Sequence, residues 1–127
     1  MRCPVCKDEM IVLELDLVEI DYCTVCGGIW LDEGELELLL QGAGEKDTLL
    51  ASFAKATDTK EKRKKCPVCR RRMDKISGGG EEKILLDSCS RSHGLWFDRG
   101  ELEQILAIGG LAEGSRLATL LKDLFKH

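Results

Sequence analysis

The feature that most constrains this chain is a duplicated arrangement of cysteines. The first copy holds two Cys-x-x-Cys pairs separated by sixteen residues, at Cys3, Cys6, Cys23 and Cys26. The second copy starts in the same way, with a spacer of nineteen residues, at Cys66, Cys69 and Cys89. Two such pairs around a short segment can bring four thiolates to one tetrahedral metal ion, and zinc is the usual occupant.

The repeat extends well beyond the cysteines. The first copy reads CPVC and then DYCTVCGGIWLDEGELE, and the second reads CPVC and then DSCSRSHGLWFDRGELE. Equivalent residues are 66 positions apart from Cys23 onward but only 63 apart at Cys3. The three extra residues fall at Ser77–Gly80, where we predict an enlarged hairpin turn. Such a repeat indicates two copies of one small fold.

The first copy predicts a closed site with four thiolates, which stabilises a fold and leaves no position for substrate water. A thioredoxin-type redox dithiol is the alternative, but that motif opens a helix in a βαβ unit. Iron in a rubredoxin-like site is a further option in vitro, because tetrahedral sulfur suits both metals.

The second copy differs at its fourth ligand. Ser92 stands at the position of Cys26, and His93 follows it. We predict a site made by Cys66, Cys69, Cys89 and His93, in which the longer imidazole makes up the shift of one residue. If His93 is instead a surface residue, the site is broken or holds three thiols and water, which would leave it open as catalytic zinc sites are. We therefore expect two zinc ions per chain.

Disulfide bonds are the rival use of paired cysteines, and they require an oxidising compartment. The start of the chain, MRCPVC, lacks the apolar core of a secretory signal, and seven is an odd number of cysteines. No apolar stretch approaches the roughly eighteen residues of a membrane span. The sequence thus favours a cytoplasmic protein with bound metal and no membrane association.

The expected fold is a small metal-stabilised α+β structure with two tandem zinc ribbons, each a β-hairpin with two metal-binding turns and a short capped helix. The first hairpin is predicted at 10–15 and 18–22, and the second at 73–77 and 82–87. Asp32 with Glu35, and Asp98 with Glu101, are spaced as capping boxes for the two helices.

Two further helices are predicted, at 47–62 in the link between the copies and at 115–125 near the end of the chain. They would cover the ribbons or mediate self-association. The predicted units are 1–44 for the first ribbon and helix, 45–64 for the link, 65–110 for the second ribbon and helix, and 111–127 for the last helix.

Two tryptophans and four acidic residues invite functional interpretations. Trp30 and Trp96 could stack on nucleic-acid bases, but we expect each to fill a small core. The acidic pairs could serve in acid–base catalysis, yet helix capping explains their spacing without further assumptions.

The segment 60–75 is the strongest candidate for contact with a partner. It carries a net charge of +7, whereas residues 1–59 carry −9 and the whole chain −4. Phosphates of nucleic acid would be contacted by Lys62, Arg63, Lys64, Lys65, Arg70, Arg71 and Arg72. The alternatives are a solvated link, or ion pairs with the acidic first half of the chain.

The strings CPVC, CxxCGGIWLDEGELE and CSRSHGLWFDRGELE resemble the transcription-factor-IIB-type zinc-ribbon family of small prokaryotic proteins, over residues 2–41 and 65–108. The resemblance implies the two ligand sets given above. Shared fold does not carry function across.

From these features we expect a non-enzymatic, zinc-binding structural or adaptor protein that binds another macromolecule, a protein in the first place, in a transcription-related process. Direct nucleic-acid binding through 60–75 is one alternative. A metal-dependent enzyme or redox protein that uses the second site is the other.

Overall fold

The computed structural model describes residues 1–57, 59–81 and 83–124, and within these ranges it is a small α+β structure with one seven-stranded antiparallel sheet and four helices. The strands lie in the order β1-β2-β3-β7-β6-β5-β4. Their bounds are β1 Ile11–Leu15, β2 Val18–Tyr22, β3 Ile29–Asp32, β4 Ala54–Lys55, β5 Asp74–Gly78, β6 Ile84–Ser88 and β7 Gly94–Phe97.

Both predicted hairpins are present, each shifted by at most two residues. β1 and β2 are joined by a two-residue turn in which Asp16 and Leu17 both have positive φ, 48° and 74°. Such turns match the right-handed twist of paired strands. β5 and β6 are joined by the longer connection 79–83, which confirms the enlarged turn, although Ser77 and Gly78 belong to β5 itself. Glu82, the predicted start of the second strand, lies outside the described residues.

The two copies are joined through their third strands, which the sequence analysis did not identify as strands. β3 pairs with β7 so that Trp30 faces Trp96, Ile29 faces Phe97 and Leu31 faces Leu95. Trp30 and Trp96 are equivalent residues of the repeat, so this pairing has local two-fold symmetry. The contact between the copies therefore resembles the isologous interface of a symmetric dimer.

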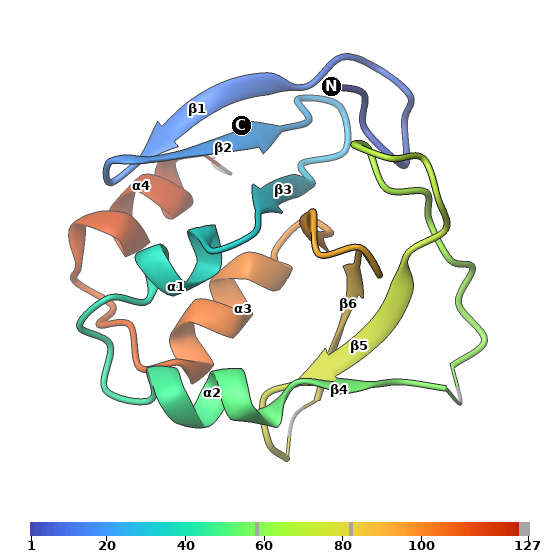
Figure 1. Cartoon of the computed structure of the whole chain (residues 1–127). Helices are drawn as coiled ribbons and strands as arrows, with labels where there is room; N and C mark the ends of the chain where they lie inside the picture. Colours follow the sequence, from blue (N-terminus) through green and yellow to red (C-terminus); the bar gives the residue numbers. More distant parts are fainter. Residues whose placement is uncertain (58, 82, 125–127) are drawn as a thin grey trace.

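The helices are α1 Glu35–Leu39, α2 Lys46–Ser52, α3 Glu101–Ile108 and α4 Arg116–Leu124. They gather on one side of the molecule, between the β1–β2 hairpin and strands β4 and β5 (Figure 1). None of the helices in the described part of the chain has the length and apolar character that a bilayer crossing requires. Phe125, the predicted end of α4, lies outside the described residues.

The predicted N-caps are wrong. Gly34 and Gly100 precede α1 and α3, with φ of 89° and 87° and no side-chain cap. Only half of each capping box forms, since the Glu35 carboxylate accepts the N–H of Asp32 at 2.6 Å and Glu101 accepts that of Asp98 at 2.8 Å. The aspartate side chains have another task, as described below.

The helix predicted at 47–62 ends earlier than expected. α2 ends at Ser52, and Phe53 is extended, with φ of −66° and ψ of 126°. Residues 54 and 55 then form β4 against Ile76 and Ser77 of β5. The Phe53 ring packs on Gly78, where a Cβ would overlap it. Pairing with the sheet edge outweighs the weak helical preference of this segment.

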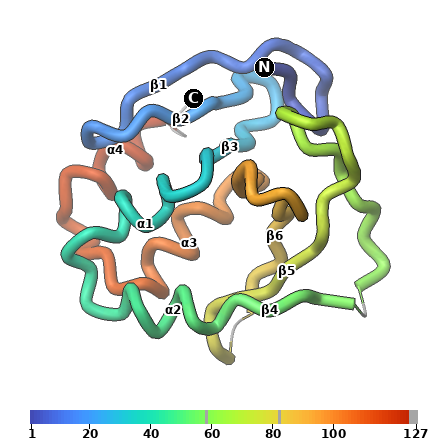
Figure 2. The backbone as a smooth tube through the Cα atoms, viewed as in Figure 1, coloured from blue at the N-terminus to red at the C-terminus, as the bar shows by residue number. Residues whose placement is uncertain are grey.

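One continuous apolar core lies between the helices and the sheet. It includes the predicted helix faces, with Leu36, Leu39 and Leu40 of the first copy and Leu102, Ile105 and Leu106 of the second all buried. A second cluster contains cysteines, two methionines and both tryptophans. In the backbone trace, the turns of this second cluster lie away from α2 and α4 (Figure 2).

Candidate metal centres

Two groups of potential ligands are found within the described ranges, and they are the two predicted sets. In the first, one sulfur from each of Cys3, Cys6, Cys23 and Cys26 lies within 4.8 Å of the others. The Sγ atoms of Cys3 and Cys26 are 3.7 Å apart. Tetrahedral zinc with Zn–S bonds of about 2.3 Å separates its sulfurs by about 3.8 Å, so the observed spacing fits such an ion.

The same spacing argues against disulfide bonds. A sulfur–sulfur bond is about 2.05 Å long, and all seven cysteines, each in the described part of the chain, are free thiols. Four sulfurs held this closely in a part-buried site form the arrangement that a shared tetrahedral metal ion requires.

Each half of a ligand group forms a tight turn, which we call a knuckle. The first knuckles, 3–7 and 66–70, precede the hairpins, and the second knuckles, 23–27 and 89–93, follow them. In the first knuckle, residues 3–7, the N–H groups of Val5 and Cys6 donate to Cys3 Sγ, both at 3.3 Å. Lys7 closes the turn with φ of 68°, and its equivalent Arg70 closes knuckle 66–70 with φ of 63°. Amides directed at sulfur stabilise a thiolate, so the backbone is arranged for metal binding.

The second group brings His93 together with Cys66, Cys69 and Cys89. Cys89 Sγ lies 3.3 Å from His93 Nδ1 and 3.7 Å from Cys69 Sγ. Ser92 has φ of 61° and closes a turn one residue shorter than in the first copy, with its N–H on Cys89 O. The tighter turn and the longer imidazole together compensate for the one-residue shift.

The thiols of the second group differ in acidity. Burial raises the pKa of Cys66 to about 11, whereas a hydrogen bond from the backbone N–H of Arg71 lowers the pKa of Cys69 to about 7. Because a thiol must lose its proton to bind metal, loading this site releases protons.

The family model described as transcription factor zinc-finger, the TFIIB-type zinc ribbon, matches residues 2–42 and 65–108. The chain belongs to this family. Neither the curated proteins nor the solved structures contain a significant match.

The two zinc ribbons share a second core built from their most polarisable side chains. Trp30 and Trp96 are fully buried, at 0% exposure, beside Met10 and its equivalent Met73. This confirms the core role predicted for the tryptophans and leaves neither ring free to stack on a base. The role of Met10 and Met73 in this core was not predicted, although each copy carries a methionine at the start of its hairpin.

The tryptophans also explain the aspartates. Trp30 Nε1 donates to Asp32 and Trp96 Nε1 to Asp98, each at 2.9 Å. A buried indole N–H requires a partner, so these carboxylates orient the rings instead of capping the helices.

Each indole also reaches across the two-fold axis. A Cβ on Gly28 would overlap the Trp96 ring, and one on Gly94 would overlap the Trp30 ring and the Leu31 carbonyl. Each zinc ribbon thus covers a glycine of the other, and the two second knuckles lie against one another's tryptophan.

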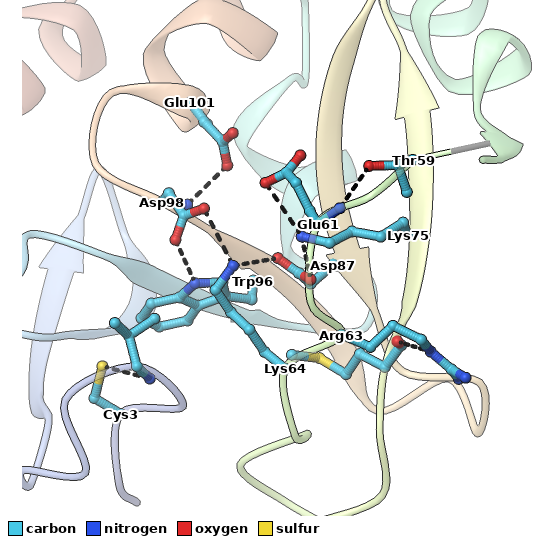
Figure 3. A network of polar contacts seen from close by, with 12 residues as sticks. Cys3, Thr59, Glu61, Arg63, Lys64, Lys75, Asp87, Trp96, Asp98 and Glu101 are labelled. Atoms are coloured by element: carbon cyan, nitrogen blue, oxygen red, sulfur yellow. Dashed lines mark hydrogen bonds and ion pairs between the residues drawn. The ribbon is translucent and has the colours of Figure 1, made fainter. Parts of the chain in front are cut away.

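Part of the basic segment is used inside the second zinc ribbon (Figure 3). Lys64 Nζ lies 3.5 Å from carboxylates of both Asp87 and Asp98. Burial opposes the charge of Lys64, but these two carboxylates raise its pKa. Buried Lys75 pairs with buried Asp87 at 2.9 Å. The ion pair between Lys75 and Asp87 was not predicted. Its signal in the sequence was that Lys75 shares the inward face of the predicted strand 73–77 with Met73.

Arg63 is likewise engaged, with its guanidinium on Met73 O at 2.8 Å and on Asp74 at 3.1 Å. Arg63 and Lys64 at the end of the link therefore pair with carboxylates of the second copy and not with the acidic first half of the chain. Solvent exposure is retained by Lys62, Lys65, Arg70, Arg71 and Arg72.

Replacement of His93 tests the second ligand set. In His93→Ala we expect the second ion to be lost to a competing chromophoric chelator under conditions that leave the first in place, because three thiolates remain where there were four ligands. Ser92→Ala, beside the group but outside it, is the control and should keep both ions. Equal zinc retention in both variants would show that His93 is not a ligand of the second ion.

A second prediction concerns pH. Burial raises the pKa of Glu101 to about 7, and Asp98 and Asp87 add to the shift. The folded chain therefore keeps a proton that the unfolded chain releases near pH 4.5, and this contribution to stability is lost as pH rises through about 7. Glu101→Gln keeps an oxygen for the Asp98 N–H but cannot ionise.

We expect the Tm of zinc-loaded Glu101→Gln, relative to wild type, to increase between about pH 6 and about pH 8.5. Exposed Glu113→Gln serves as the control. A Tm difference that is the same throughout this range would show that Glu101 ionises as an ordinary surface carboxyl.

Proposed function

We propose that this protein is a non-enzymatic binding module, stabilised by two zinc ions, that presents its surface to a macromolecular partner in a transcription-related process. The observation that supports this most is that each ligand group consists of four protein side chains. A zinc ion with four protein ligands has no position for substrate water. The same argument weighs against a catalytic role for the second site.

The knuckles offer a surface for a protein partner. Equivalent residues Val5 and Val68 are 45% and 46% exposed at the tips of the two first knuckles, and Val25 of the knuckle 23–27 is 66% exposed. Rigid turns that hold branched apolar side chains in solvent lose little conformational entropy on binding. The proposed partner is therefore a protein that contacts the knuckle tips.

The test is capture from the source cell with immobilised, zinc-loaded protein. One arm uses wild type and the other Val5→Ser/Val68→Ser, with Leu17→Ser as the control, since Leu17 is 88% exposed but sits on the hairpin turn away from the knuckles. A protein retained by wild type and the control but not by the knuckle variant supports the proposal. Equal retention by all three contradicts it.

Nucleic-acid binding through the basic segment is the second candidate. It is supported by the exposed side chains of Arg70, Arg71 and Arg72, which follow a knuckle directly. Reversal of these charges should abolish a salt-sensitive gel shift, and the absence of any shift at low salt would remove this candidate.

A further inference from the structure

The two first knuckles lie side by side and enclose a cleft of about 410 Å³. The knuckle near the amino terminus and the one that follows Lys65 can be seen next to each other in Figure 1. We call this space the knuckle cleft, and it is lined by Met1, Arg2, Cys3, Pro4, Lys7, Glu9, Lys65, Cys66, Pro67 and Arg70.

The lining repeats the two-fold symmetry of the fold. Arg2 is equivalent to Lys65 and Lys7 to Arg70, with the same offset that relates Cys3 to Cys66. The two knuckles thus place matching cations on opposite sides of one cleft. This arrangement was invisible in the sequence, where Arg2 and Lys7 stand in a strongly acidic half of the chain.

The four cations of the cleft have no carboxylate partner among the residues that the structure describes. In residues 1–57, 59–81 and 83–124, no carboxylate is found within ion-pair distance of Arg2, Lys7, Lys65 or Arg70. The acidic residue of the lining, Glu9, is taken by the terminal ammonium group at 3.1 Å. Lys7 Nζ donates to the carbonyl of Pro4 at 3.3 Å, which holds its charge near the turn.

We propose that the knuckle cleft binds a phosphate group. Cations that line one cleft without a carboxylate partner in the described part of the chain form a local positive site that attracts anions, even though the whole chain has a net charge of −4. Arginine and lysine together suit phosphate, which accepts several charge-assisted hydrogen bonds at once. Both tryptophans are buried, so neither ring can stack on a base, and the charged side chains of the cleft suit a phosphate group.

Two sources of phosphate share this chemistry, namely a free oligophosphate and the backbone of nucleic acid. The site requires folded knuckles and so rests on the metal-stabilised fold proposed above, but it requires no protein partner. Zinc content measured on every sample separates failure of the fold from failure of the phosphate site.

The experiment titrates zinc-loaded, isotope-labelled protein at low salt with pyrophosphate in one arm and with a short DNA duplex in the other. We expect amide shifts at 5–7 and 68–70 together. Shifts in both arms identify a backbone-binding site, and shifts with pyrophosphate alone identify a small-ligand site. Shifts at these residues with DNA alone also support a backbone-binding site. No shift in either arm, or shifts confined to 60–64 and 71–72, would overturn the proposal.

A pair of variants tests the residues. Lys7→Gln/Arg70→Gln should weaken phosphate binding by about tenfold or more, because it removes two charge-assisted hydrogen bonds. Lys62→Gln/Arg71→Gln removes the same charge from exposed positions outside the cleft and should weaken it far less. Equal losses in both variants would mean that only total charge matters. If the cleft variant loses zinc while wild type shows no phosphate shifts, these cations serve the thiolates instead.

Discussion

Removal of both metal ions is expected to unfold this protein. The cysteines, methionines and tryptophans form one cluster, and β3 and β7 carry residues of both this cluster and the main core. Binding free energies of structural zinc sites are roughly 10–16 kcal/mol, whereas a whole domain is stable by about 5–15 kcal/mol. The binding free energy lost with two ions therefore exceeds the whole stability expected of a domain of this kind.

The measurement is circular dichroism and an amide NMR spectrum before and after addition of a chelator. We expect loss of spectral dispersion with the chelator and recovery when zinc is restored. The same chelator saturated with zinc beforehand is the control and should change nothing. A dispersed spectrum that persists without metal would mean that the shared apolar core is sufficient by itself.

Gly28→Ala, just before β3, is expected to be strongly destabilising although it adds only one methyl group. The new methyl group would occupy the space of the Trp96 ring, which is fully buried and cannot move aside. Overpacking of this kind costs about 1–3 kcal/mol, and here it strikes the contact that joins the two zinc ribbons. Denaturant unfolding of the zinc-loaded protein would measure the loss.

Two further variants make this test specific. Gly44→Ala adds the same methyl group in open space and should leave the free energy of unfolding nearly unchanged. In Gly28→Ala/Trp96→Phe the smaller ring makes room for the methyl group, so the double variant should lose less stability than the two single losses combined. Simple additivity would mean that the ring and the glycine do not interact.

The parts of the fold that could be predicted are those in which a local signal decides the structure. The ligand sets follow from cysteine spacing, and the hairpins follow from short β-branched segments around a turn. The 63 and 66 offsets even placed the enlarged turn between β5 and β6. All eight predicted ligands meet in two groups.

What could not be predicted depends on contacts between the copies. Ile29, Trp30 and Leu31 are all buried, so they lack the alternation that marks a strand with one exposed face, and the segment has only four residues. Asp32 was assigned to the helix because its spacing to Glu35 fits a capping box. The competing indole N–H became visible only once the tryptophan was placed.

The residues predicted to contact nucleic acid fall into two groups, some in internal ion pairs and some exposed, and the sequence could not separate them for a similar reason. Net charge along the chain treats Lys64 and Arg70 alike, but Lys64 pairs with the buried carboxylate of Asp87 and with Asp98, whereas Arg70 lines the knuckle cleft. Arg2 and Lys7 join Arg70 only through the pairing of β3 with β7, which brings the two knuckles together.

The self-matching register of β3 against β7 has a consequence for chains that contain one copy alone. Such a chain would carry an open sheet edge and an indole without the glycine that covers it. An identical second molecule supplies both, because equivalent residues already face one another across the seam. A chain that carries both copies makes this pairing permanent instead of concentration-dependent, and its two halves need not be identical, as Ser92 and His93 in place of Cys26 illustrate.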